Sequence, residues 1–515
     1  MRSLQIIDGV DNQSPGLNFS LGNFLGASDL DVLKVDLVVG ASSAFFGPNA
    51  FNGVIDMRTK NPFLQKGLSA SVKVGERNML KTAVRYADVI KNKSGEDKFA
   101  YKINLMYLTA DDWEANNFNP TDQSRRDADN PGGYDAVNVY GDENLDNGRN
   151  FDLPDSTAYA NFPGLGEFYR RGYEERDLVD YGTENIKASA ALHYKLTQDI
   201  ELIGSYSFGS GTTVYQGDNR FSLKDIKFYQ SRIEIMKPNK FFLRAYQTGE
   251  DAGNSYDAYF TALLLQEEFK SNSQWSSDYI AIWRNNGSNR VRQLEGYPQG
   301  FPINFPQLVN VINSNQDSIS KWHQQVQDLT NSPTVFNPNS FLEPGTPEFQ
   351  EAFDRITSNL PTDEERGTRF FDRSKLFHVH GEYKFTPKFM DITLGANYRK
   401  YSPDSKGTIF SDTADVKITN SEFGVYTGIE KKFIDQKLKV NATLRMDKNE
   451  NFDLLFSPAV SAVYSPDKKN IFRVSFSSAI RNPTLADQYL NFDVGRATLL
   501  GNLNGVNNVV TLESV

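Results

Sequence analysis

The sequence predicts an all-β transmembrane protein, part of a large antiparallel outer-membrane barrel. Three observations predict this fold class: segments of about ten residues that alternate apolar and polar, connections of very unequal length between them, and no stretch suited to a membrane-spanning helix. The longest stretch that is both uncharged and rich in apolar residues, 37–47, is far shorter than the ~20 residues such a helix needs. A tilted barrel strand needs only ~9 to 11 residues.

The composition favours β-structure and excludes several functions. The chain has 37 Phe and 24 Tyr against 4 Trp, and aromatic residues favour strands, while Tyr suits a boundary between apolar and aqueous surroundings. A net charge of -10 argues against a nucleic-acid partner. Without cysteine, the chain has no disulfide, thiol nucleophile or cysteine metal site. Asp8 and Asp11 interrupt the region of a secretory signal, so we expect either a cytoplasmic protein or a missing N-terminus.

The clearest alternating segment is FAYKINLMYLT, residues 99–109. One face carries Phe99, Tyr101, Ile103, Leu105 and Tyr107, and the other carries Ala100, Lys102, Asn104 and Met106. Twelve further segments alternate similarly, at 68–76, 80–88, 184–196, 200–208, 224–234, 240–248, 376–385, 389–400, 421–432, 437–446, 454–465 and 470–478. Period two is the signature of strands with unlike faces, so we expect thirteen strands.

The connections distinguish a membrane barrel from a soluble sandwich, in which strands also alternate. Tight links at 197–199, 434–436 and 465–470 follow even-numbered segments, whereas very long links near 110–183 and 249–375 follow odd-numbered ones. Short turns at one rim and long loops at the other, outer rim are typical of outer-membrane barrels. A Lys or Arg that faces lipid costs ~2 to 4 kcal/mol, so Lys102, Lys437, Lys439 and Arg445 should point into a polar lumen.

Two stripes of apolar residues in the second long loop predict helices over the barrel mouth. The first stripe contains Phe305, Leu308, Ile312, Ile319, Trp322, Val326 and Leu329. In the second, Thr346 suits a cap, Pro347 suits the first helical position, and Phe349, Phe353, Ile356 and Leu360 form the stripe. The stripes either pack the loop against itself or form a groove for a partner.

Two patterns could bind a metal, and each has a simpler interpretation. Asp142, Asn144 and Asp146 alternate as in the first part of a calcium loop, but Gly148 comes one place late and Leu153 occupies the position of the bidentate Glu. We therefore interpret the segment as a solvated acidic loop and predict no calcium site.

The second pattern is His378 and His380, which share one face of a strand. Glu382 and Lys384 lie on the same face, so we interpret the histidines as lumen residues and predict no metal site. No hydrolase elbow, P-loop, HExxH or dinucleotide motif occurs in the sequence. We therefore predict no enzyme and no cofactor.

The first sixty residues resemble the C-terminal half of the plug domain of TonB-dependent outer-membrane receptors. Ile7, Asp8 and Gly9 match an IDGV element. The family's second element is matched by Phe46, Gly47, Asn52, Gly53, Val54, Ile55, Thr59 and Lys60, although Val39, Gly40 and Ala41 replace its usual Arg-Gly-Pro, which removes one charge that helps to seat the plug. Later, Arg481, Asn482 and Pro483 match an Arg-x-Pro motif of a wall strand.

The resemblance implies a division into a plug end, residues 1–62, and a barrel wall, residues 63–515. Barrels of this family have about 22 strands, so thirteen strands would leave about nine unaccounted for, and we expect the chain to be a fragment. It would lack the signal, the TonB-contacting segment and the closing strands.

The implied function is energised import of a siderophore–iron complex, a cobalamin-like compound, an oligosaccharide or a peptide. Implied partners are the TonB complex, outer-membrane lipid and a surface lipoprotein, with no nucleic acid. Plug apices bind ligand in this family, so Phe45, Phe46, Asn49 and Phe51 are candidate contacts, although plug packing and turn formation also explain them. The alternatives are a passive porin or adhesin and an outer-membrane or secreted hydrolase.

Overall fold

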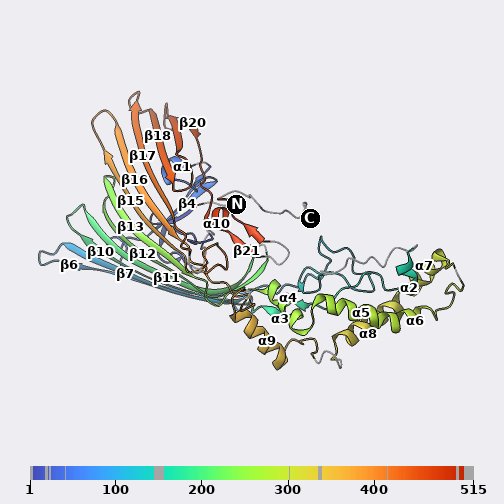
Figure 1. Cartoon of the computed structure of the whole chain (residues 1–515). Helices are drawn as coiled ribbons and strands as arrows, with labels where there is room; N and C mark the ends of the chain where they lie inside the picture. The colour runs from blue at the N-terminus through green and yellow to red at the C-terminus, as the bar shows by residue number, and fades with distance from the viewer. Residues whose placement is uncertain are drawn as a thin grey trace.

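A curved antiparallel sheet forms the largest part of the computed structural model (Figure 1). The structure describes the chain except residues 1–3, 18–20, 22–24, 41, 144–155, 218, 301, 334–338, 363, 414–415, 494–497 and 504–515. Within the described residues the sheet has 14 strands, of which β14 (Tyr256–Asp257) pairs beside the main path. The other thirteen follow one another in chain order, as predicted, and we call them the wall.

Apart from β5 and β20 at its two edges, the wall strands are long enough to cross a membrane when tilted. They are β5 (Gly67–Val74), β6 (Leu80–Lys91), β7 (Asp97–Asp111), β10 (Gly182–Lys195), β11 (Glu201–Gln216), β12 (Arg220–Lys237), β13 (Phe241–Asp251), β15 (Lys375–Phe385), β16 (Asp391–Ser402), β17 (Asn420–Phe433), β18 (Leu438–Asn449), β19 (Leu455–Tyr464) and β20 (Phe472–Ser477). At one rim every connection is short, whereas the other rim carries the two long ones, which leave β7 and β13.

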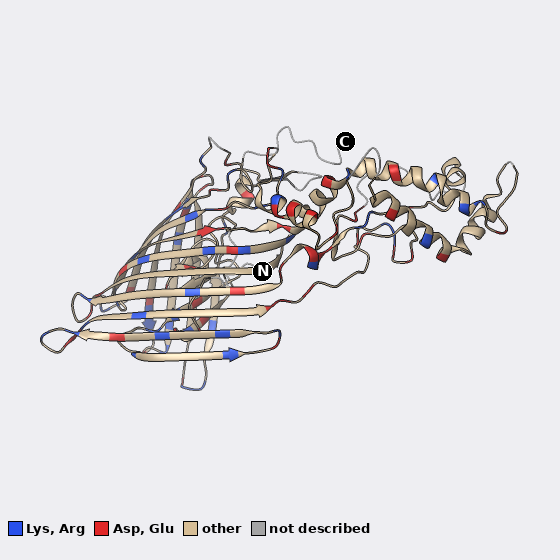
Figure 2. Ribbon diagram, turned by 90° about the horizontal axis from the view of Figure 1, so that it is seen from below, with Lys and Arg blue, Asp and Glu red and all other residues tan. Residues whose placement is uncertain are grey.

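The two faces of the wall have the predicted character. Lys102 and Arg445 are buried on the concave face, at 6% and 2% exposure, whereas Leu105 on the opposite face of β7 is 55% exposed. Lys439 lies on the same face of β18 as Arg445 and pairs with Glu430. Figure 2 shows the charged residues as separate bands along the wall strands.

One lumen assignment was wrong. Lys437 precedes β18, and its backbone N–H donates to Ile434 in the turn after β17. The side chain is exposed there. Lys437 is polar and directly precedes apolar Leu438, so it fits the polar–apolar alternation of β18 although it belongs to the turn.

A small sheet from the first sixty residues lies on the concave side of the wall, and we call it the N-terminal unit (Figure 1). Its strands are β1 (Leu4–Ile7), β2 (Val10–Asp11), β3 (Val32–Val39) and β4 (Gly53–Thr59), in the order β2-β1-β4-β3, and its helix is α1 (Ser43–Phe46). Gly53 has a φ of 133°, and an added Cβ would lie 2.6 Å from the Val38 carbonyl oxygen, so this close approach of β3 and β4 requires glycine.

The two long connections fold together into a helical module, made of the described residues of 112–181 and 252–374. Figure 1 shows it extending from one rim of the wall. It contains β8 (Val139–Tyr140), β9 (Tyr173–Glu174), α2 (Thr157–Asn161), α3 (Glu175–Leu178), α4 (Ala258–Phe269), α5 (Asn272–Asn285), α6 (Gly287–Val291), α7 (Phe305–Asn313), α8 (Gln316–Asn331) and α9 (Pro347–Ser358). A hydrophobic core of its own, centred on Trp275, Tyr279 and Trp283, holds the module together.

The predicted helices are confirmed. α7 and α8 carry the first apolar stripe, and α9 begins after Thr346, whose side chain accepts a hydrogen bond from the Phe349 N–H. Most residues of the stripes face the core of the module, so they pack the loops against themselves, whereas Leu329 is 50% exposed.

The last described elements follow the Arg481 motif. They are α10 (Leu485–Tyr489), β21 (Asn491–Asp493) and β22 (Thr498–Leu500). Among the described residues, no helix has the length and apolar character needed to span a membrane.

Candidate functional site

The N-terminal unit is held on the wall by charged side chains, and the most enclosed of these contacts centres on Asp31. Arg85 Nε of β6 donates to Asp31 Oδ1 at 2.7 Å, and Lys102 Nζ of β7 donates to Asp31 Oδ2 at 2.7 Å. The three side chains are between 2% and 7% exposed. Lys102 also donates to Thr59 Oγ1 of β4 at 2.7 Å, so one wall lysine joins two segments of the unit.

A second contact lies at the turn between β1 and β2. Arg232 Nη1 of β12 donates to the Asp8 carbonyl oxygen at 2.8 Å, and Arg244 Nη1 of β13 donates to the Gly9 carbonyl oxygen at 3.0 Å. Arg244 also donates to the Glu234 carboxylate of β12, through Nε at 3.0 Å and Nη2 at 2.9 Å. A Cβ on Gly9 would overlap the Arg244 guanidinium, so only glycine admits this arginine.

Asp8 carries a full charge at this turn. Burial alone would raise its pKa, but Arg232, Lys102 and the hydrogen bonds from Thr59 outweigh it and lower the pKa from 3.8. Thr59 donates to Asp8 through its hydroxyl at 2.6 Å and its N–H at 2.9 Å. Asp8 and Gly9 therefore form the turn between β1 and β2, and Asp8 also presents a negative charge to Arg232 of the wall.

A third contact surrounds Asp11, where an aromatic and cationic group of wall side chains meets the unit. Tyr246 Oη accepts from the Asp11 N–H at 3.3 Å and lies 2.6 Å from His378 Nδ1. Arg399 Nη1 is 4.0 Å from Asp11 Oδ2. Burial raises the pKa of Asp11 to about 6, although the Arg399 charge opposes this.

The two histidines of β15 bond to tyrosines. His378 bonds to Tyr246, and His380 Nε2 lies 3.0 Å from Tyr426 Oη, while the two imidazole rings are parallel with centroids 6.0 Å apart. Within the described ranges, no three His, Cys, Asp or Glu side chains group as a metal site would require. The Glu382 carboxylate accepts from Tyr426 at 2.6 Å, which extends a polar network along the wall.

Of the candidate calcium loop, only Asp142 lies among the described residues, and Asn144, Asp146, Gly148 and Leu153 lie outside them. Asp142 Oδ2 accepts from the Ala136 N–H at 3.0 Å. Burial, with the neighbouring Glu143 charge, raises the pKa of Asp142 well above 3.8.

A cavity of about 780 Å³ lies between the N-terminal unit and the wall. Its lining includes the cations Arg232, Arg244 and Arg399, and the carboxyl groups of Asp8 and Asp11. Arginine forks and tyrosine hydroxyls can bind the carboxylate, phosphate or phenolate groups of a ligand.

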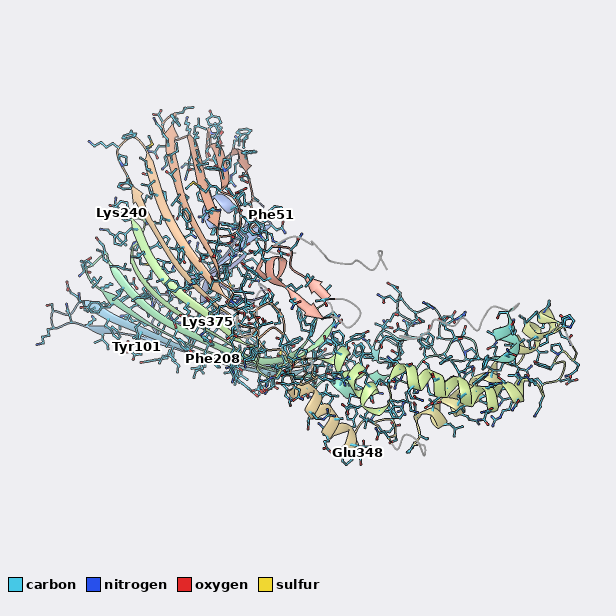
Figure 3. The ribbon with its side chains drawn as sticks, viewed as in Figure 1. Phe51, Tyr101, Phe208, Lys240, Glu348 and Lys375 are labelled. Atoms are coloured by element: carbon cyan, nitrogen blue, oxygen red, sulfur yellow. The ribbon has the colours of Figure 1, made fainter. Side chains whose placement is uncertain are left out.

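The four candidate ligand residues lie at different places. Phe45, 53% exposed, and the partly buried Phe46 line this cavity from α1. Asn49, with a φ of 83°, lines a separate small crevice, and Phe51 is 49% exposed. Figure 3 shows Phe51 on the N-terminal unit, near α1. The structure therefore brings Phe45 and Phe46 together, while Asn49 and Phe51 lie apart, and their role in binding stays a prediction.

Sequence reasoning missed the charged residues that seat the unit. Asp31, Arg85, Arg232, Arg244 and Arg399 were not singled out, although the four arginines occupy the lumen-facing positions of alternating segments. A charge on the inward face of a strand was the available signal. Arg85, Arg232 and Arg399 meet carboxylates of the unit, and Arg244 donates to its Gly9 carbonyl oxygen. These contacts seat the unit although Val39, Gly40 and Ala41 replace the family's usual Arg-Gly-Pro.

A family model described as TonB dependent receptor-like, beta-barrel matches residues 239–512, more than half of the chain. The chain belongs to the TonB-dependent receptor family. This is a family of transport receptors and not of enzymes. No curated protein matches the chain.

Solved receptors are similar in structure to this chain at low sequence identity. A mutant of the ferric enterobactin receptor PfeA from Pseudomonas aeruginosa is 11% identical with a TM-score of 0.51, over 94% of this chain and 55% of that chain. The FrpB iron transporter from Neisseria meningitidis, F3-3 variant, is 11% identical with a TM-score of 0.49, over 94% and 58%. The siderophore receptor PirA from Acinetobacter baumannii is 11% identical with a TM-score of 0.48, over 95% and 55%. The receptor chain thus spans little more than half the length of these structures.

Proposed function

We propose that this chain forms part of a bacterial outer-membrane receptor that takes up a scarce ligand by a TonB-dependent mechanism. The family, whose members are outer-membrane proteins, supports the location. The observation that carries the proposal is the seating of the N-terminal unit against the lumen face through buried ion pairs at Asp31 and hydrogen bonds at Asp8. A passive pore would not need such a unit inside it.

In this proposal residues 1–62 form the end of a plug and residues 63–515 form part of the barrel, with outer loops near 110–183 and 249–375. Energy would come from the TonB complex. Movement of the plug would then break the charged contacts with β6, β7, β12 and β13 in turn. A surface lipoprotein is a further proposed partner of the outer loops.

An iron chelate is the first ligand class to test, because the similar PfeA structure is that of a ferric enterobactin receptor. Cobalamin-like compounds, oligosaccharides and peptides follow. Arg232, Arg244 and Arg399 in the cavity lining favour a ligand with anionic oxygens.

Uptake by cells that carry the complete gene tests the function. Accumulation of labelled ferric siderophore, cobalamin, oligosaccharide and peptide is compared with and without a protonophore, and with and without TonB. We expect one ligand class to accumulate and accumulation to fall at least about tenfold when either energy source is removed, since an energised step then fails. Accumulation that neither treatment changes would favour a passive barrel.

Alanine variants test the proposed ligand contacts. Once a ligand is identified, Phe45→Ala, Phe46→Ala, Asn49→Ala and Phe51→Ala are each expected to weaken its binding, by up to about 1–3 kcal/mol for an aromatic contact. Phe389→Ala is the matched control, because Phe389 is also exposed, at 60%, but lies in a turn. Equal affinities for the four variants and the control would remove these residues from the site.

A further inference from the structure

The loop of residues 14–16 in the N-terminal unit rests on two carboxyl groups of the wall rim. Ser14 Oγ donates to Glu250 Oε2 at 2.5 Å, and the Gly16 N–H donates to Glu250 Oε1 at 2.6 Å. Asp372, just before β15, accepts from the Ser374 N–H at 2.9 Å. Ser14, Glu250, Asp372 and Ser374 are all at most 5% exposed.

The backbone of Gly16 lies directly against both carboxyl groups. An added Cβ would be 2.6 Å from Asp372 Oδ2 and 2.9 Å from Glu250 Oε1. The loop therefore closes over the carboxyl pair at a position where no side chain fits. Water is excluded from the pair while the loop is seated.

No described Lys, Arg or His side chain forms an ion pair with Glu250 or Asp372. Arg373, the neighbouring cation, pairs with Asp251 at 3.1 Å. Asp412 also faces the pair and adds negative charge, while its own carboxylate accepts from the Gly407 N–H at 3.0 Å.

The other groups that face the pair do not neutralise it. Ser405 donates to Asp412 through its N–H and its hydroxyl. The phenol of Tyr229 on β12 lies over Gly249, beside Glu250. Two buried carboxylates without a cation cannot both be ionised at low cost, so the pair retains a proton.

We propose that residues 14–16, Glu250 and Asp372 form a proton-dependent clasp that fastens the N-terminal unit to the rim of the wall. Protonation keeps the pair neutral or singly charged while the loop donates its two hydrogen bonds. As the pH rises and Asp372 ionises, negative charge builds up in an enclosed site without a cation, and release of the loop admits water that solvates it. The clasp concerns seating, so it holds whichever ligand the receptor carries.

The direction of the pH effect follows from Asp372. Burial, reinforced by the Asp412 charge, raises the pKa of Asp372 from 3.8 to about 6. The seated state thus binds the proton more tightly than the released state, so the clasp is fully stabilised below pH 3.8 and loses this stabilisation as the pH rises through about 6. A shift of this size corresponds to a change of roughly a hundredfold in the ratio of seated to released loop.

A spin label next to the loop tests the clasp in the complete receptor in lipid nanodiscs. Leu17 follows the loop with a 40% exposed side chain, and the chain has no cysteine, so Leu17→Cys places a single label. We expect the ratio of immobile to mobile spectral components to fall by up to about a hundredfold between pH 4 and pH 7. A ratio that does not change with pH overturns the proposal.

Two substitutions separate the clasp from general charge effects. Asp372→Asn carries a permanent amide donor toward Glu250, so the label should stay immobile at every pH; Glu250→Gln should likewise remove the pH dependence. Asp251→Asn is the matched control, since Asp251 is the adjacent carboxylate paired with Arg373, and it should leave the transition near pH 6 in place. Retention of the parent transition in both clasp variants, or its loss in the control, overturns the proposal.

Discussion

At the residue scale, Asp31 determines whether two wall cations are neutralised. Arg85 and Lys102 point into an enclosed space, where a cation without a partner loses its hydration and gains nothing in return. A single carboxylate with one oxygen toward each cation satisfies both. Asn104 Nδ2, 3.3 Å from Asp31 Oδ2, completes the surroundings.

Replacement of Asp31 by asparagine is expected to destabilise the seated unit by about 3–5 kcal/mol, because two buried cations lose their counter-charge. Hydrogen exchange of the β4 amides measures this, since their exchange requires local opening of the unit. Asp29→Asn is the control. Asp29 also binds two lysines, Lys73 and Lys81, but it is half exposed, so its loss should cost less than about 1 kcal/mol. Equal exchange rates in the two variants would contradict the assigned role of Asp31.

The sequence predicted the face of Lys102 and Arg445 but not their partners. Period-two alternation is local, so it places a side chain on the inward face of its own strand. Asp31 could not be paired with Lys102 from spacing, because it reaches β7 only through the fold of another sheet. Asp447, by contrast, lies two residues from Arg445 on the same face of β18, so the alternation could have paired them. The ligand role of Phe45 and Phe51 stays a prediction, because alternation and spacing say nothing about which molecule contacts a side chain.

At the scale of the element, strands and capped helices were predicted best. Thirteen alternating segments correspond to the thirteen wall strands, and Thr346 with Pro347 marks the start of α9. Helices α4 and α5 were not predicted from the sequence. The α4 sequence, AYFTALLLQEEF, is apolar on most sides, because the helix is packed among other elements of the module, so it lacks a single stripe.

His323 on α8 joins two helices of the module and should make its stability depend on pH. Its Nδ1 lies 2.7 Å from the Tyr279 hydroxyl, its Nε2 lies 3.0 Å from the Gly164 carbonyl oxygen, and its ring stacks on Trp283 at 4.0 Å. A carbonyl accepts only, so Nε2 carries the proton and Nδ1 accepts from the tyrosine. Burial lowers the pKa of His323 from 6.5 to about 4.

The module is therefore expected to lose stability as the pH falls from 6.5 to 4. In this window the unfolded histidine binds a proton that the folded one does not, which costs on the order of 3 kcal/mol in total. All four tryptophans, at 113, 275, 283 and 322, lie in the long connections, so tryptophan fluorescence during urea unfolding follows the module alone.

His323→Gln, which cannot titrate, provides the comparison. Asp257, whose pKa burial raises to about 6, has the opposite pH dependence and is present in both proteins. The difference between parent and variant therefore isolates His323. If that difference is the same at pH 7 and at pH 4, the neutral buried histidine is not the cause.

At the scale of the whole molecule, the order of short and long connections gives the wall its two ends. The structure places the helical module at one rim and the short turns at the other, as alternation of the connections predicted. Figure 3 shows Glu348 on the module and Lys240 at a turn between β12 and β13. The packing of the two long connections into one module could not be predicted, because each contributes part of a shared core.

The orientation in the membrane follows from the same asymmetry and is open to direct measurement. Long loops of outer-membrane barrels lie outside the cell and short turns lie in the periplasm. Because the chain has no cysteine, Glu348→Cys on the module and Lys437→Cys in the turn after β17 each provide one thiol at an exposed position. In intact cells, a membrane-impermeant maleimide should label residue 348 and leave residue 437 unlabelled until the outer membrane is permeabilised. Labelling of residue 437 but not of residue 348 in intact cells would reverse the orientation, and it would place the clasp of residues 14–16 on the periplasmic side.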